Sequence, residues 1–335
     1  MKHDKTSKPM DTTYLGIVLS GSRLMIGEVN TAGDILQHKA YKLSFFNQES
    51  ALDIIHTSME DYVRSASLAE RKPAAIGVGL IGRVNADEGV WYQIDSGRTH
   101  PINVAREITN WYGIPCFTDN DVKSETRAIM RWGLGQKTEN FVYLHTGTGI
   151  AAGLVIDGKP IRGSHFNAGE VGHLRVGVRV GLKCPCGRMD CIETIASSVG
   201  IDRQIRFLKR YYDTQLQIPQ QGERVSVDEV YRLCREGDPL CTKVVDNAAE
   251  AMASLIMNLV RVSDPDTVIL AGEMLSDGFL LEQIRQRLQP VTMRFVTGGV
   301  VLTQLDAQYI GLLGAGALAI DGSEGMTTTA KAIKK

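Results

Sequence analysis

The sequence lacks a strong net charge, a long apolar run and a dense set of cysteines. Its 37 Lys and Arg nearly balance its 38 Asp and Glu, giving a formal net charge of -1, so the chain as a whole has no electrostatic footprint for nucleic acid. No apolar run is as long as a membrane span, and the polar start lacks the apolar core of a secretory signal. Six cysteines in 335 residues fit a reducing compartment better than a disulfide framework. We therefore expect a cytoplasmic protein without a membrane or direct nucleic-acid partner.

The length of the chain predicts two lobes, because 335 residues exceed what one hydrophobic core usually supports. A strand-rich beginning near residue 14 recurs near residue 141, which suggests two lobes of related design with a cleft between them. Strands that alternate with helices favour a mixed α/β sheet. We expect an N-terminal lobe over residues 13–121, with a C-terminal helix at 309–322 packing back on it, a C-terminal lobe over 122–308, and disordered tails at 1–12 and 323–335.

Apolar periodicity and turn residues place the individual elements. The longest helix is expected at 243–262, and a Gly- and Ala-rich helix at 310–320 is expected to approach its neighbours closely. Residues 81–101 are expected to form a loop. The predicted strands are 14–19, 24–29, 35–43, 74–80, 114–118, 141–144, 150–156 and 267–270, and the other predicted helices are 50–66, 103–112 and 121–132.

A metal site is predicted in the stretch from residue 167 to 197. His173, Cys184, Cys186 and Cys191 fall within nineteen consecutive positions. Three thiols and one imidazole match the ligand set of a closed, four-coordinate structural zinc site, which leaves no position open for a catalytic water. The alternative is a set of buried or incidental cysteines.

Two further segments have the pattern of ligand sites. Asn120 and Asp121 stand where a predicted strand meets the start of a helix, and the carboxyl ends of strands are where α/β sheets bind ligands. On spacing alone, Asp121 could equally be only a helix N-cap. The glycine-rich turn at 145–149 has backbone N–H groups that could cradle a phosphate, which alone is weak evidence.

At these residues the chain resembles the ROK family of repressors, open reading frames and sugar kinases. The resemblance rests on an ExGH motif ending at His173 and on a CxCGxxxCxE motif that runs from Cys184 to Glu193, with Asp190 replacing the family's usual glycine. It implies the two-lobed α/β fold of sugar kinases and actin, which is ribonuclease H-like, with a zinc-stapled loop. It also implies a sugar or amino-sugar ligand and, as is common in the family, a homodimer.

The resemblance assigns roles to individual residues. Asp121 would be the general base that takes the proton from the attacking sugar hydroxyl, and Asn120 would hold neighbouring hydroxyls. Glu170, His173 and Glu193 would be the other sugar contacts, with His173 binding zinc through one ring nitrogen and facing the sugar with its other edge. The nucleotide phosphates would lie against Gly21, Ser22, Thr146, Gly147, Thr148, Gly149 and Gly272.

Three positions depart from the kinases of the family, all on the nucleotide side. Val18 stands where a DxGGTK-like loop has its metal-orienting aspartate, Lys123 stands where an amide is common, and Glu273 follows a single glycine in the adenosine loop. We therefore favour a sugar-responsive regulator with a degraded ATP site and lean against an enzyme. The residues before Thr13 are too few for the winged helix-turn-helix of the family's repressors. The alternative is an ATP- and Mg²⁺-dependent hexose or N-acetylhexosamine kinase.

Overall fold

The structure is a computed structural model of the chain, and its backbone is described for residues 12–21, 23–43, 46–65, 72–94, 100–220 and 222–333. It divides into two compact units. Unit 1 comprises Met1–Trp132 together with Gln308–Lys335, and unit 2 comprises Gly133–Ala307. Most of the expected N-terminal tail and the candidate phosphate contact Ser22 lie outside the described residues.

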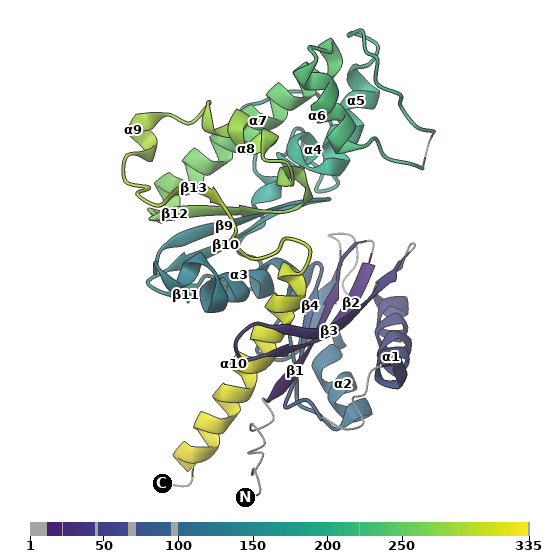
Figure 1. Cartoon of the computed structure of the whole chain (residues 1–335), viewed down its shortest axis with the longest axis vertical. Helices are drawn as coiled ribbons and strands as arrows, with labels where there is room; N and C mark the ends of the chain where they lie inside the picture. Colours follow the sequence, from purple (N-terminus) through teal and green to yellow (C-terminus); the bar gives the residue numbers. More distant parts are fainter. Residues whose placement is uncertain are drawn as a thin grey trace, which may run out of the picture. The chain divides into compact units, whose positions relative to one another are not determined.

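Unit 1 is built on a five-stranded mixed sheet of order β3-β2-β1-β4-β8 (Figure 1). The first three strands are antiparallel neighbours, whereas β4 pairs parallel with both β1 and β8. The strands β1 and β4 are buried along their whole length, as expected when helices cover both faces. The strands are β1 (Thr13–Leu19), β2 (Arg23–Asn30), β3 (Ile35–Lys42), β4 (Ile76–Leu80) and β8 (Cys116–Asn120).

Unit 2 repeats this design with a sheet of order β11-β10-β9-β12-β13. Here too an antiparallel hairpin is followed by two parallel neighbours, so both sheets have the same sequence of pairings. One large core forms where helices pack on this sheet, and α7 supplies much of it. The strands are β9 (Phe141–Thr146), β10 (Ile150–Ile156), β11 (Lys159–Pro160), β12 (Thr267–Ala271) and β13 (Gly299–Leu302).

The helices begin and end at residues suited to those positions. The Asn103 side chain caps α2 by accepting a hydrogen bond from the N–H of Arg106, and Gly113 ends that helix at φ 60°. Asp238 caps α7, whose first residue is a proline. The helices are α1 (Gln48–Ser65), α2 (Val104–Tyr112), α3 (Asp121–Trp132), α4 (Glu193–Ala196), α5 (Ser198–Leu208), α6 (Val227–Arg235), α7 (Pro239–Ser263), α8 (Phe279–Arg285), α9 (Pro290–Met293) and α10 (Ile310–Ile333), with short 3-10 turns η2 (Leu134–Gln136), η3 (Val171–His173) and η4 (Glu273–Leu275).

The C-terminal helix α10 packs on the sheet of unit 1 and on α3. The predicted close approach is confirmed, since a Cβ atom on Gly77 would lie 1.9 Å from the carbonyl oxygen of Ala315 and one on Gly314 would lie 2.5 Å from the backbone of Ser124. A larger residue at Gly77 would push the helix off the sheet, and one at Gly314 would push it off α3. The helix also continues to Ile333. The prediction of a disordered tail from residue 323 is therefore wrong for residues 323–333.

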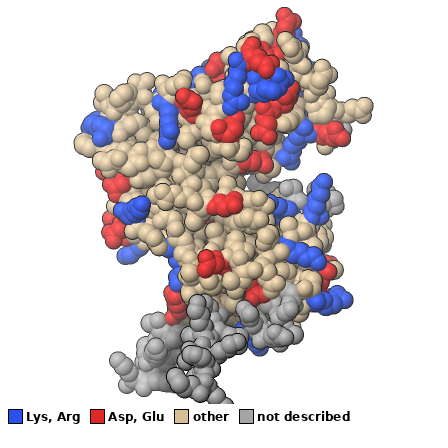
Figure 2. Space-filling view, in the orientation of Figure 1, with Lys and Arg blue, Asp and Glu red and all other residues tan. Residues whose placement is uncertain are grey.

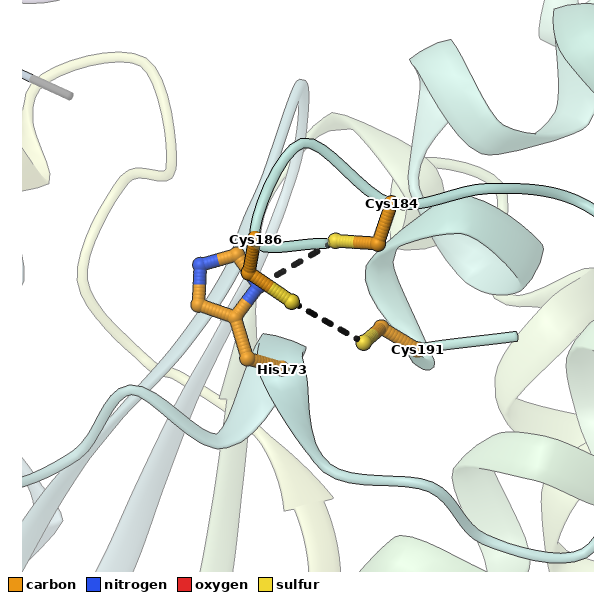
Figure 3. Close-up of side chains that lie close together, drawn as sticks. All are labelled: His173, Cys184, Cys186 and Cys191. Carbon is orange, nitrogen blue, oxygen red and sulfur yellow. Dashed lines mark hydrogen bonds between the residues drawn. The ribbon is translucent and has the colours of Figure 1, made fainter. Parts of the chain in front are cut away.

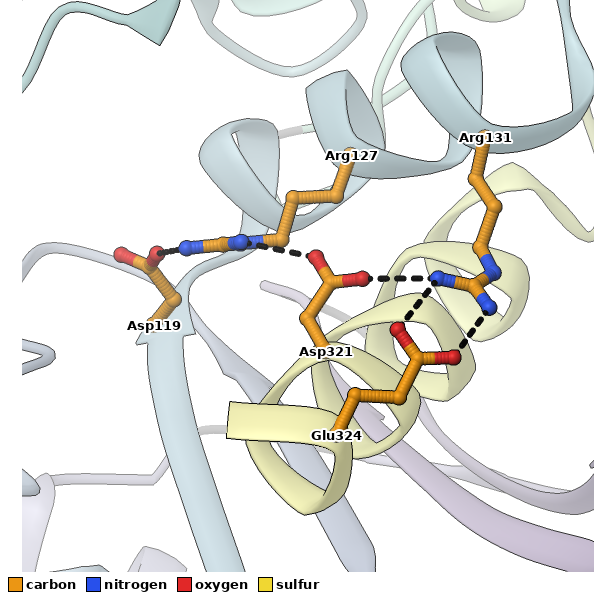
Figure 4. A network of polar contacts seen from close by, with 5 residues as sticks. All are labelled: Asp119, Arg127, Arg131, Asp321 and Glu324. Atoms are coloured by element: carbon orange, nitrogen blue, oxygen red, sulfur yellow. Dashed lines mark hydrogen bonds and ion pairs between the residues drawn. The ribbon is translucent and has the colours of Figure 1, made fainter. Parts of the chain in front are cut away.

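Ion pairs explain why α10 is longer than predicted and why α3 belongs to unit 1 rather than opening the second lobe. Asp321 of α10 bridges Arg127 and Arg131 of α3 at 2.9 and 3.0 Å (Figure 4). Glu324, beyond the expected end of the helix, pairs with Arg131 at 2.8 Å. Arg127 also reaches the buried Asp119 at 3.4 Å, next to the candidate sugar-site residues.

The segment 81–101 is not a simple loop. It contains β5 (Arg83–Asn85) and β6 (Val90–Gln93), and β6 also pairs with β7 (Ile102–Asn103) just beyond the segment, so the three strands form a small antiparallel sheet. The side chain of Trp91 is fully buried and anchors this sheet to unit 1 through a hydrogen bond to the carbonyl of Ile81. Burial of so large a side chain gives a short, polar segment its regular structure.

The surface shows no dominant charge on the face drawn in Figure 2. Basic and acidic side chains alternate there among uncharged ones, consistent with the near-zero net charge of the chain. Among the residues described, no helix is both long enough and apolar enough to cross a membrane.

Candidate functional site

The structure brings the four predicted metal ligands of unit 2 together. The ligand atoms of His173, Cys184, Cys186 and Cys191 all lie within 4.8 Å of one another (Figure 3). In tetrahedral zinc sites, with Zn–S near 2.3 Å and Zn–N near 2.0 Å, the donor atoms are separated by similar distances. The cluster therefore could hold a metal ion, and its donor set fits structural zinc.

His173 points its Nδ1 atom into the cluster, 3.5 Å from the sulfur of Cys184. It ends the turn η3, and the guanidinium of Arg188 donates a hydrogen bond to its backbone carbonyl. This placement leaves Nε2 on the other side of the ring, as the predicted double role of His173 requires.

The thiols differ in their readiness to lose a proton. The backbone N–H of Arg188 hydrogen-bonds to the Cys186 sulfur and lowers its pKa to about 6. Burial raises the pKa of Cys191 to about 12 and also raises that of Cys184. A bound cation would reverse the effect of burial, because zinc binds thiolates.

Asp190 organises the metal loop, a role that its sequence position alone did not reveal. It adopts φ 56°, the left-handed conformation that favours the glycine usual in the family. Its side chain is buried, and one carboxylate oxygen accepts hydrogen bonds from the N–H groups of Val180, Gly181 and Leu182 at 3.2, 2.7 and 3.0 Å. Aspartate thus fits the turn and also fixes the backbone of residues 180–182, which precede Cys184.

Asn120 and Asp121 lie in unit 1, at the junction of β8 and α3. The Asn120 side chain donates to the carbonyl of Gly82 at 2.9 Å and accepts from the N–H of Lys123 at 3.2 Å. The helix is therefore capped by Asn120, so capping alone does not account for Asp121. The Asp121 carboxylate accepts a hydrogen bond from the N–H of Val122 at 2.9 Å and is half-buried at the carboxyl ends of two parallel strands.

The predicted phosphate loop connects β9 and β10 in unit 2. Thr146 is buried and its hydroxyl donates to the carbonyl of Ala271 at 3.1 Å, whereas Thr148 is exposed. Glu193 begins α4, and its Oε2 atom accepts a hydrogen bond from the N–H of Ile150 at 3.1 Å. A Cβ atom on Gly149 would lie 2.8 Å from the same oxygen, so a larger residue there would require the Glu193 carboxylate to move.

Of the other predicted nucleotide contacts, Gly21 is exposed in the β1–β2 turn of unit 1 and Gly272 precedes η4 in unit 2. Gly272 has φ 117°, and a Cβ atom there would lie 2.0 Å from the carbonyl oxygen of Thr146. Only glycine permits this approach between the ends of β9 and β12. The predicted sugar contact Glu170 is exposed at the start of η3.

Val18 lies in a close-fitting niche at the end of β1. Its side chain is 9% exposed and packs beside Gly79 and Gly311, at 3.6 and 3.1 Å from the positions of their missing Cβ atoms. An isopropyl group cannot ligate Mg²⁺, so the end of β1 does not fit the metal-orienting role that the family's kinases give to this position.

Solved structures with the same arrangement define the class of fold. One is a ROK family transcriptional regulator, a homologue of the Escherichia coli MLC protein, with a TM-score of 0.76 and 23% identity over 92% of this chain and 78% of that chain. Another is a ROK family glucokinase from Streptomyces griseus in complex with glucose and AMPPNP, with a TM-score of 0.74 and 22% identity over 92% of this chain and 99% of that chain. The protein therefore has the two-sheet α/β fold of these sugar kinases.

The sequence also identifies the family of the protein. The model of the ROK family matches residues 14–322, and the chain belongs to this family. Its relatives include a glucokinase from Halalkalibacterium halodurans, 26% identical over 86% of this chain and 89% of the relative. They also include the DNA-binding transcriptional dual regulator NagC from Escherichia coli, 22% identical over 91% of this chain and 74% of the relative.

These relatives confirm the resemblance to the ROK family and its α/β fold. They do not support our leaning against an enzyme, because sugar kinases stand among them as prominently as repressors. The kinase alternative is thus at least as well supported as the regulator interpretation. The roles assigned to individual site residues remain predictions.

Proposed function

We propose that this chain is an ATP-dependent sugar kinase acting on a hexose or N-acetylhexosamine, with Asp121 as the general base. The observation that carries the proposal is the position of Asp121 at the junction of β8 and α3, where its half-buried carboxylate lies at the carboxyl ends of two parallel strands. A carboxylate at that edge suits a base, because phosphoryl transfer depends mainly on positioning and charge stabilisation. The kinases among the relatives support this proposal.

Other residues complete the proposed site. Asn120, Glu170, His173 and Glu193 would contact the sugar. The loop from Thr146 to Gly149, with Gly21, Ser22 and Gly272, would contact the nucleotide phosphates. Zinc held by His173, Cys184, Cys186 and Cys191 would fix the loop that carries the sugar ligands without entering the chemistry. A cytoplasmic homodimer is part of the same proposal.

A second candidate is a sugar-responsive regulator, and Val18 is the observation that favours it. An apolar residue in a close-fitting niche weakens the nucleotide side of the site while leaving the predicted sugar contacts unchanged. Regulators occur among the relatives as well. In this case the sugar would shift the protein between two states without phosphoryl transfer.

The test is release of ADP from ATP across a panel of hexoses and N-acetylhexosamines. We expect turnover with at least one sugar, and we expect Asp121→Asn to reduce kcat by at least about 100-fold. Asp53→Asn, on the exposed face of α1, is the matched control and should retain activity. Sugar-dependent thermal stabilisation of the wild type without ADP release from any sugar would refute the kinase and support the regulator.

A further inference from the structure

The phosphate loop of unit 2 has a carboxylate beside it that the proposed chemistry does not use. Glu273 begins η4 directly after Gly272, whose close approach to Thr146 fixes where the Glu273 side chain starts. A Cβ atom on Gly147 would lie 3.9 Å from the Cγ atom of Glu273, which is van der Waals distance. The Glu273 side chain therefore lies beside the Thr146–Gly149 loop.

Ser198, the first residue of α5, holds this carboxylate in place. Its hydroxyl donates a hydrogen bond to Oε1 of Glu273 at 2.8 Å, and its backbone N–H donates to the carbonyl of Gly147 at 2.9 Å. One residue thus ties the carboxylate and the loop together. Ser198 is only 7% exposed, whereas Glu273 is exposed. A buried hydroxyl therefore holds one oxygen of a carboxylate that is otherwise open to solvent. The N-terminal end of α5 also favours a negative charge at this place.

An anion on the loop would therefore meet a fixed carboxylate. Glu193 already accepts the N–H of Ile150 at the far end of the loop, so carboxylates stand at both of its ends. Like charges a few ångströms apart repel each other, and water screens this only in part beside a protein surface. Each added phosphate group of a ligand would increase the repulsion.

Resting on the kinase proposal above, we propose that Glu273 is a specificity-determining residue that lowers the affinity of the Thr146–Gly149 loop for nucleotide phosphates. The carboxylate, held by Ser198, discriminates against ligands in proportion to their phosphate charge. It leaves recognition of the uncharged nucleoside unaffected.

The test compares the binding of ATP, ADP and adenosine to the full chain by isothermal titration calorimetry with Mg²⁺ present. Glu273→Gln keeps the shape and the acceptor for Ser198 but removes the charge. We expect Kd for ATP to fall about tenfold and Kd for ADP to fall less, while Kd for adenosine stays the same. Glu250→Gln removes the same charge from an exposed position on α7 and should change none of the three.

Ser198→Ala provides an independent variant, because it keeps the backbone hydrogen bond to Gly147 and releases only the carboxylate. We expect a smaller gain in ATP affinity than in Glu273→Gln. Unchanged or weaker ATP binding in both variants would overturn the proposal, and weaker binding would show that the carboxylate assists the nucleotide. Tighter ATP binding by Glu273→Gln with no ADP release from any sugar would instead remove the kinase proposal and leave this one intact.

Discussion

Asp190 shows how one side chain can satisfy two demands that glycine would meet only in part. The turn before Cys191 requires a left-handed backbone, which aspartate tolerates better than most residues. Its buried carboxylate then accepts three backbone N–H groups, from the half-buried Val180, the exposed Gly181 and the buried Leu182. The substitution relative to the family is therefore a gain of order in the metal loop.

The hydrogen bonds and the backbone conformation of Asp190 can be separated by substitution. Asp190→Ala loses both, and we expect it to lower the free energy of unfolding by about 2–4 kcal/mol. Asp190→Gly keeps the conformation and should cost less, and Asp190→Asn keeps an acceptor oxygen and should cost least. Urea denaturation followed by circular dichroism measures the three values. Equal stability of Asp190→Gly and the wild type would show that the carboxylate contributes nothing.

Position 18 cannot simply be restored to the family's aspartate. Oε1 of Glu125 and the nearest methyl of Val18 lie 3.6 and 3.1 Å from the same point, the missing Cβ atom of Gly311. Glu125 itself is buried, one turn after Asp121 on α3. A carboxylate at position 18 would thus stand close to a second one in a site with little water.

Val18→Asp is therefore expected to be less stable than Val18→Asn, which has nearly the same shape without the charge. We expect the difference in the free energy of unfolding to be about 1–3 kcal/mol at pH 7. In a Glu125→Gln background the difference should be smaller, because the repulsion is removed and only the cost of burying the charge remains. A double-mutant cycle from urea denaturation measures this coupling. Additive effects of the two substitutions would show that the two positions do not interact.

At the scale of elements, α10 holds unit 1 together from the far end of the chain. It packs through glycines and alanines against β1 and β4, and its acidic residues pair with Arg127 and Arg131 of α3. Because Arg127 also contacts Asp119, the network reaches the residue before Asn120 and Asp121. The C-terminal helix therefore supports the strand end where the proposed base lies.

The elements that periodicity predicts best are those whose packing is local or simple. The long helix α7 and the buried strands β1 and β4 follow directly from apolar patterns and caps. The sheet β5–β7 depends on burial of Trp91 in the core of unit 1, among residues such as Leu24 and Ile55. The length of α10 depends on ion pairs to α3, and these also join residues distant in sequence. The apolar periodicity of a single segment carries no information about such contacts.

The candidate site likewise has a part that the sequence predicts and a part that it does not. The metal cluster was predictable because its ligands lie close together in sequence and their chemistry is specific. The positions of Asp190 over the loop at 180–182 and of Glu273 beside Gly147 were not, because each depends on backbone that meets only after folding. The available signals in the sequence were the replacement of the family's glycine by Asp190 and the position of Glu273 after a single glycine in the adenosine loop.

At the scale of the whole molecule, unit 1 is discontinuous in sequence and unit 2 is inserted within it. All three tryptophans, Trp91, Trp111 and Trp132, lie in unit 1, whereas the metal cluster lies in unit 2. Tryptophan fluorescence therefore reports on unit 1 alone, and circular dichroism reports on both. This difference makes the effect of metal binding at the cluster measurable for each unit.

Removal of the metal should destabilise unit 2 before unit 1. Ligand binding at a structural zinc site contributes directly to folding, so Cys186→Ser should lower the metal content below one ion per chain by elemental analysis. Its circular dichroism Tm should fall by at least about 5 °C, while the fluorescence Tm moves less. Treatment with a chelator should reproduce this, and Cys234→Ser, a thiol outside the cluster, should not. Unchanged metal content would show that the cluster is not the metal site, and equal shifts of both signals would show that the units unfold as one.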